Sequence, residues 1–178
     1  MSLRFTPDYR FEKFNDATPD FFLKLGIKGV ILDIDNTLVT YDDPKPTESV
    51  AAWLDAMHAA GVQTAFVSNN HAPRVESFCE GLGCYYHADA KKPSRKFMRA
   101  AMEHMGTTNM DTACVGDQLF TDVWAGKRCG MKAFLVPPIK DKKTLFFRAK
   151  RLLEKPFLSM YYKRNQSNRE EIKNDKIL

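Results

Sequence analysis

One pattern recurs along this sequence: a short apolar run that ends in polar side chains. It occurs over residues 28–35, 62–70 and 112–118. A strand that is buried on both faces of a parallel sheet is apolar along its length and presents its polar groups at its carboxyl end. Because the carboxyl ends of parallel strands meet at one edge of the sheet, we expect the three polar ends to converge on one crevice.

The segments around these strands predict the rest of an α/β fold. Thr47 can cap a helix with apolar residues at helical spacing that stops at Gly61. Ser94 can cap a second helix that stops at Gly106. Shorter helices are expected over residues 74–81 and 122–129, and further strands over residues 84–88 and 132–138. At least four β–α repeats predict a Rossmann-like, doubly wound parallel sheet with helices on both faces.

The polar groups at the strand ends suit the hydrolysis of a phosphate ester. This reaction needs a nucleophile, an acid for the leaving oxygen, and positive charge to offset the transferring phosphoryl group. Asp33 can attack phosphorus to give an acyl phosphate. Asp35 can protonate the leaving group and then activate the water that hydrolyses the intermediate. Asp117 and Asp33 offer the hard oxygen ligands that suit Mg²⁺, so a magnesium site is implied.

Other polar residues at the same strand ends could bind the phosphoryl group. Thr37 and Ser68 supply hydroxyls, and the backbone amides of residues 34–37 could form a nest for an anion. Either Lys91 or Lys92 could add a cation.

Two further residues of these segments have alternative roles. Asp122 could hold a metal-bound water or orient the lysine. Asn69 could hydrogen-bond the substrate or satisfy backbone groups of its turn. Residues of these types are common in turns, and only their combination with Asp33 and Asp117 indicates catalysis.

Four short motifs resemble, in order and approximate spacing, those of the haloacid dehalogenase superfamily. They are DIDNTL (33–38), VSNN (67–70), KKP (91–93) and GDQLFTD (116–122). The DxDxT form of the first motif is the superfamily's phosphatase form. The resemblance implies a nucleophile at Asp33, an acid and base at Asp35, phosphate contacts by Thr37, Ser68 and Lys92, and metal binding by Asp33, the backbone carbonyl of Asp35 and Asp117. Lys92 is preferred over Lys91 because the family's lysine commonly precedes a proline.

A longer likeness covers about residues 5–155. The strings FTPDYRF, SNNHAPRVESFCEGLG, ADAKKP and GDQLFTDVWAGKRCGM are similar to the capless subclass IIIA group called YqeG-type. Members of that group are associated with dephosphorylating phosphatidylglycerophosphate, the precursor of phosphatidylglycerol. The resemblance therefore implies a Mg²⁺-dependent phosphatase that acts on a phospholipid headgroup. The alternatives are the same chemistry on a nucleotide, a nucleic-acid end or a phosphoprotein, and a non-catalytic module that binds a phosphorylated ligand or RNA.

The spacing of the motifs leaves no room for the cap domain that usually gives this superfamily its specificity. Residues 38–67 hold a loop, one helix and a strand, and residues 71–90 hold another helix and a short strand. An uncapped crevice favours a phosphate that is presented on something large. We expect one capless domain over residues 1–155, with residues 1–27 as an N-terminal extension packed on it, and a basic, flexible tail over residues 156–178.

Positive charge is concentrated near the C-terminus. Residues 140–178 carry 12 Lys and Arg against 5 Asp and Glu. A helix in this segment could lie on an anionic bilayer, or could cover the sheet while its charges stay solvated. The mixed charges of the last residues disfavour nucleic acid as a partner.

The sequence shows no secretory signal and no apolar run near the roughly 20 residues that span a bilayer. We therefore expect a cytoplasmic protein that can reach the inner face of the membrane. The residues give no prediction of oligomeric state.

Overall fold

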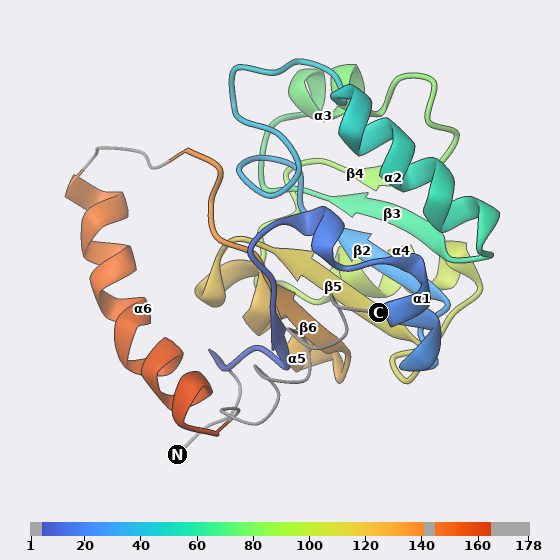
Figure 1. Ribbon diagram of the computed structural model, residues 1–178. Coiled ribbons are helices and arrows are strands. Elements are labelled where there is room, and N and C mark those ends of the chain that lie inside the picture. The colour runs from blue at the N-terminus through green and yellow to red at the C-terminus, as the bar shows by residue number, and fades with distance from the viewer. Residues whose placement is uncertain (1–4, 141–144, 165–178) are drawn as a thin grey trace. The chain divides into compact units, whose positions relative to one another are not determined.

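Six parallel strands form a single sheet in the computed structural model, which describes residues 5–140 and 145–164 (Figure 1). Their order across the sheet is β1-β6-β5-β2-β3-β4, and every neighbouring pair is parallel. The strands are β1 (Tyr9–Arg10), β2 (Gly29–Leu32), β3 (Gln63–Val67), β4 (Tyr85–His87), β5 (Thr112–Gly116) and β6 (Lys132–Leu135). The predicted α/β fold with a parallel sheet is confirmed.

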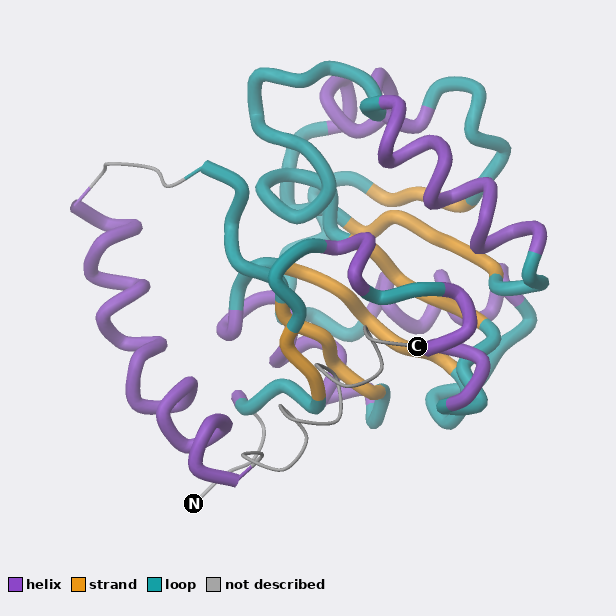
Figure 2. The backbone as a smooth tube through the Cα atoms, viewed as in Figure 1, coloured by secondary structure: helices purple, strands orange, loops and turns teal. Residues whose placement is uncertain are grey.

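Helices lie on both faces of the sheet (Figure 2). In the sheet domain they are the short helices η2 (Phe14–Asp16) and η3 (Leu119–Val123) and the α-helices α1 (Pro19–Lys24), α2 (Glu48–Ala59), α3 (Ala72–Cys79), α4 (Lys96–Met105) and α5 (Trp124–Cys129). A further helix, α6 (Leu145–Arg164), follows in the chain. Thr47 caps α2, because its side chain accepts a hydrogen bond from the amide of Val50. Arg95 rather than Ser94 occupies the N-cap position of α4, but the side chain of Ser94 accepts a hydrogen bond from the amide of Lys96, the first residue of the helix, at 3.4 Å.

Alternate residues of the strands pack against different helices. Val30 and Leu32 belong to the hydrophobic core that includes residues of α1 and α2, whereas the buried Ile31 lies between them and points to the other face. On that other face α5 approaches β5 closely, since a Cβ atom on Gly126 would collide with the sulfur of Cys114. The close approach brings the segment before α5 to the carboxyl end of β5.

The aromatic N-terminal segment is part of the core of this sheet domain. β1 pairs with β6, and the ring of Tyr9 stacks on that of Phe134 with centroids 5.1 Å apart. Phe11 and Phe22 are buried, and so is Phe14, which meets Trp53 of α2 edge-on. These aromatic residues therefore cover and extend the hydrophobic core of the sheet domain.

No cap domain is inserted between β2 and β4 in the described chain. A loop and α2 connect β2 to β3, and α3 connects β3 to β4. The carboxyl edge of the sheet is therefore bordered by loops of the domain itself, as the motif spacing predicts.

Helix α6 forms a compact unit separate from the sheet domain. It is continuous across residue 155, where we expected the domain to end, and it contains Pro156. The domain limits stay a prediction, and the part of the expected tail from residue 165 onward lies outside the described residues. Among the described helices, none has the length and apolar character needed to cross a membrane.

Candidate active site

The polar groups that the sequence places after three strands lie at one edge of the sheet. β2 runs between β5 and β3, so their carboxyl ends are neighbours. Asp33 follows β2, Ser68 follows β3 and Asp117 follows β5, and all three are buried. Sequence positions that are far apart thus meet at the edge where parallel sheets bind ligands.

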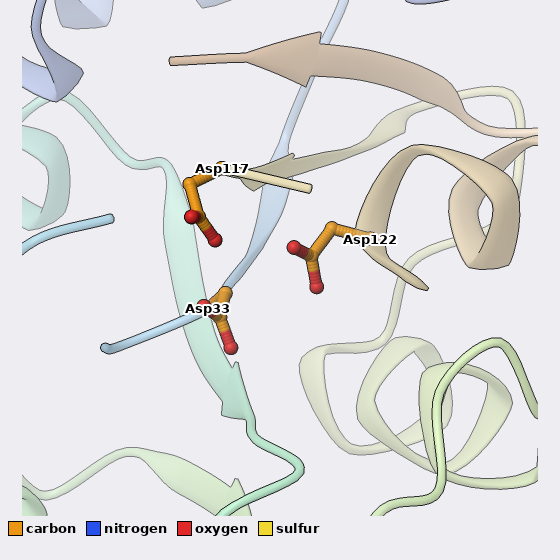
Figure 3. Close-up of side chains that lie close together, drawn as sticks. All are labelled: Asp33, Asp117 and Asp122. Carbon is orange, nitrogen blue, oxygen red and sulfur yellow. The ribbon is translucent and has the colours of Figure 1, made fainter. Parts of the chain in front are cut away.

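Three carboxylates form a tight cluster at this edge. Asp33, Asp117 and Asp122 each offer an oxygen within 4.8 Å of the others (Figure 3). Asp122 reaches the cluster from η3, and its close approach needs Gly116, because a Cβ atom there would lie 2.6 Å from Asp122 Oδ2. The amide of Gln118 donates to the same oxygen at 3.1 Å and holds the side chain in place.

Lys92 places its ammonium group between two of these carboxylates. Its Nζ lies 2.7 Å from Asp33 Oδ1 and 2.6 Å from Asp122 Oδ1, and its side chain is 3 % exposed. Burial alone disfavours the charged form, but Asp122 and Asp33 outweigh it and raise the pKa of Lys92 above its usual range. Lys92 therefore stays protonated, whereas its neighbour Lys91 is exposed.

Asn69 holds the backbone of Lys92 rather than facing the cluster. The amide of Lys92 donates to Asn69 Oδ1 at 2.6 Å, and Asn69 Nδ2 donates to the carbonyl of Lys92 at 3.2 Å. Of the two alternatives for Asn69, the geometry favours the one in which it satisfies backbone groups.

The charges of the cluster fit a divalent cation. Asp33, Asp117 and Asp122 face one ammonium, so two negative charges are left over in a buried site. Burial is the largest influence on Asp33 and raises the pKa of its carboxyl to about 6, although Lys92 opposes the shift. Closely spaced carboxylate oxygens are the ligands that Mg²⁺ prefers, so the donor set suits this ion.

Asp35 points to a different set of partners. Its Oδ2 accepts from Asn70 Nδ2 at 2.9 Å, and its Oδ1 accepts from Arg74 Nε at 3.1 Å and lies 3.0 Å from Arg74 Nη2. Arg74 also donates to the carbonyls of Thr40 and Pro44, at 3.4 and 3.1 Å. One arginine thus fixes both the Asp35 carboxylate and the loop that follows β2.

The hydroxyl groups predicted to bind phosphate lie beside the cluster and its neighbouring turn. Thr37 Oγ1 donates to Asp33 Oδ2 at 3.2 Å, and Ser68 Oγ accepts from the amide of Asn70 at 3.0 Å. Two of the four amides of the expected nest serve the loop itself, since residue 36 donates to the carbonyl of Val39 and Thr37 donates to that of Ile34.

Tyr41 and Arg74 were not indicated by the sequence. Tyr41 is half-buried, and burial followed by the charge of Asp117 raises the pKa of its phenol above its usual range, so the group stays neutral. A lone tyrosine in a polar loop and a lone arginine in a short amphipathic helix resemble solvated residues. The one available signal was that Arg74 follows closely on the SNN motif.

Comparisons with known proteins now bear on this site. The family model described as haloacid dehalogenase-like hydrolase matches residues 39–130. The chain belongs to this hydrolase family. It is also 34 % identical over 167 residues to "Probable phosphatase YqeG" of Bacillus subtilis (strain 168), a match that covers 94 % of this chain and 97 % of the relative. The hydrolase is a phosphatase, as the motifs predict.

Solved structures of this family share the fold. The cobalt-bound deoxy-D-mannose-octulosonate 8-phosphate phosphatase of Haemophilus influenzae is 20 % identical, with a TM-score of 0.52 over 64 % of this chain and 70 % of that one. CbbY of Rhodobacter sphaeroides, in complex with phosphate, is 13 % identical, with a TM-score of 0.52 over 67 % of this chain and 90 % of that one. At these identities the likeness shows the fold alone.

Proposed function

We propose that this phosphatase is a Mg²⁺-dependent phosphomonoester hydrolase that forms an aspartyl-phosphate intermediate on Asp33. The observation that carries the proposal is the buried ammonium of Lys92 between Asp33 and Asp122, with Asp117 in the same cluster. Such an arrangement offers a carboxylate nucleophile together with positive charge for a transferring phosphoryl group. A module that only bound phosphate would have no need of a carboxylate beside the ligand.

The reaction takes place in two displacements at phosphorus. A carboxylate oxygen of Asp33 attacks, the bond from phosphorus to the ester oxygen breaks, and Asp35 gives that oxygen a proton. Water then attacks the acyl phosphate while Asp35 accepts its proton, which releases inorganic phosphate and restores Asp33. Lys92 and Thr37 orient the nucleophile, because each hydrogen-bonds one of its oxygens.

Mg²⁺ would be held by Asp33, Asp117 and the backbone carbonyl of Asp35. The ion would supply charge that offsets the phosphoryl oxygens. Asp122 acts through Lys92, whose position it fixes. Ser68 offers its hydroxyl to the phosphoryl group.

The proposed substrate is a phosphate monoester on a phospholipid headgroup, with phosphatidylglycerophosphate as the leading candidate. Three features support it: the resemblance to the YqeG-type group, the absence of a cap in the described chain, and the character of α6. In that helix Leu152 and Leu153 are each 63 % exposed, and Lys155 and Lys163 are exposed too. An amphipathic basic helix of this kind suits the anionic inner face of a membrane.

Phosphate release tests both the chemistry and the substrate. Native protein and Asp33→Asn are compared on phosphatidylglycerophosphate in mixed micelles and on a soluble monoester, with and without Mg²⁺. We expect native protein to need Mg²⁺ and to prefer the lipid, and Asp33→Asn to be inactive. Turnover of the soluble ester alone would overturn the lipid substrate, and an active Asp33→Asn would overturn the mechanism.

A further inference from the structure

A basic pocket adjoins the backbone segment that carries Lys92. It has a volume of about 730 Å³ and is open to solvent. Five of its seven lining residues are cationic, namely Lys91, Arg95, Lys96, Arg99 and Arg128, and the other two are Pro93 and Ser94. No acidic side chain of the described chain lines it, so the lining presents a single sign of charge.

Among the described residues, the cations of this basic pocket have none of the carboxylate partners that other surface lysines have. Lys45 lies 3.1 Å from a carboxylate oxygen of Glu80, and Lys140 lies 2.7 Å from one of Asp42. Within the described residues, none of the five cations of the pocket has an acidic oxygen within 4.0 Å. Their charge is therefore available to an external anion.

Two contacts hold Arg128 in place. Arg128 Nη1 donates to the carbonyl of Pro93 at 2.7 Å, and its guanidinium lies over the ring of Trp124, 5.5 Å from the centroid. The lining joins residues of the segment 91–99 with Arg128 of α5, so positive charges from two separate segments of the chain meet at one hollow.

The position of these charges is unfavourable for the helix that carries them. Lys96 and Arg99 lie in the first turn of α4, and no residue of that turn is acidic. Arg95, at the N-cap position, makes no capping hydrogen bond with its side chain. A helix N-terminus carries partial positive charge, so cations there reduce helix stability. The same charges favour a bound anion, which would accept hydrogen bonds from the cationic side chains.

We propose that the basic pocket binds the phosphate diester of a glycerophospholipid headgroup while Asp33 acts on the phosphate monoester of the same molecule. This inference rests on the proposed function, and it assigns to the basic pocket the selection of the phosphatase's substrate. Lys91 and Pro93 line the pocket and are the sequence neighbours of Lys92, so the two phosphate sites share one stretch of backbone. Because the described chain contains no cap to enclose the substrate, selection falls to the surface of the sheet domain.

Two soluble substrates isolate this selection from membrane binding. One is glycerol 3-phosphate, which carries a monoester alone, and the other is the deacylated headgroup, glycerophosphoglycerol phosphate, which carries a diester as well. The measured quantity is the ratio of kcat/KM for the headgroup to that for glycerol 3-phosphate. We expect native protein to favour the headgroup and Arg99→Gln to lower the ratio about tenfold or more, the loss expected for a hydrogen bond to a charged group.

Lys28→Gln is the matched control, since it removes one positive charge from an exposed lysine outside the pocket. It is expected to keep the native ratio. An unchanged ratio in Arg99→Gln would overturn the proposal. If Arg99→Gln keeps the native ratio but no longer binds phosphatidylglycerol vesicles or an RNA oligonucleotide, the pocket is a site for that other ligand instead.

A binding measurement separates failure of this inference from failure of the proposed function. Glycerophosphoglycerol carries the diester without a monoester, so its binding does not depend on turnover. Amide chemical shifts around residues 95–99 are expected to move in native protein and to stay unchanged in Arg99→Gln. If the amide shifts change with glycerophosphoglycerol but no monoester is hydrolysed, the diester site stands and the hydrolase mechanism is refuted. If monoesters are hydrolysed but the amide shifts do not change, the diester site alone is refuted.

Discussion

At the scale of single residues, Lys92 balances part of the negative charge of the acidic cluster. Lys92→Met would keep much of the side-chain volume but leave Asp33 and Asp122 buried without their cation. Removing one partner of a buried ion pair destabilises a protein by about 3–5 kcal/mol. We expect the free energy of unfolding in urea, measured without Mg²⁺, to fall by that order. Lys91→Met changes the exposed neighbour and is expected to unfold like native protein; equal stability of both variants would contradict the charge balance described above.

Arg74 is expected to position Asp35 for proton transfer. Arg74→Gln would remove the paired contacts to Asp35 Oδ1 and the two hydrogen bonds to the loop. Since general acid catalysis contributes roughly 10²–10⁴ in rate, we expect kcat/KM for an alkyl phosphate, which reports the first displacement alone, to fall by about 10² or more. The kcat/KM for p-nitrophenyl phosphate should fall much less, because its leaving group needs no proton. Equal losses on both substrates would show that Arg74 has only a structural role.

The sequence indicated the residues of the cluster better than the residues that hold them. Asp33 and Asp117 could be placed together because both follow apolar strands, and a parallel sheet brings strand ends to one edge. Arg74 and Tyr41 reach the site through side-chain conformation and loop path, which no spacing in a single sequence encodes. The role of Asn69 likewise depended on which amide partners lie within reach.

At the scale of elements, the junction of β5 and η3 determines where Asp122 lies. Gly116→Ala would place a methyl group on the Asp122 side chain, which must then move away from Lys92. We expect a large loss of kcat, on the order of 10²-fold, because misplacing a catalytic group by about 1 Å costs that much. Gly26 has open space around its Cα atom but a positive φ, so Gly26→Ala serves as a control for lost glycine flexibility away from the site. Native kcat in Gly116→Ala would contradict the account of this junction.

Most strands and helices could be predicted from the sequence, with ends that shift by a few residues. The first predicted strand covers residues 28–35, whereas β2 ends at Leu32, because the polar residues that follow turn into the site loop. β1 could not be predicted, since its two residues are extended only through pairing with β6, more than 120 residues away. The short π-type helix η3 has no periodic signature in the sequence.

At the scale of the whole molecule, the concentration of positive charge near the C-terminus indicates a separate task for α6. The double variant Leu152→Ser and Leu153→Ser removes two exposed apolar side chains, each worth about 1.5–3 kcal/mol when buried. We expect its co-sedimentation with phosphatidylglycerol vesicles to fall at least tenfold. Met110→Ser removes an apolar side chain of the sheet domain that is 77 % exposed, and this variant should sediment like native protein. Native sedimentation of the double variant would refute membrane contact by α6.

A trapped phosphoprotein tests the central claim, the covalent role of Asp33, most directly. Asp35→Asn is mixed for milliseconds with ³²P-labelled p-nitrophenyl phosphate and Mg²⁺ and is quenched in acid. Because this leaving group needs no acid while hydrolysis of the intermediate needs the base, label should accumulate on the protein, be released by hydroxylamine, and be absent in the variant that also carries Asp33→Asn. Two results would contradict an aspartyl-phosphate on Asp33. In one, native protein releases phosphate but Asp35→Asn carries no label. In the other, the label persists in the variant that also carries Asp33→Asn.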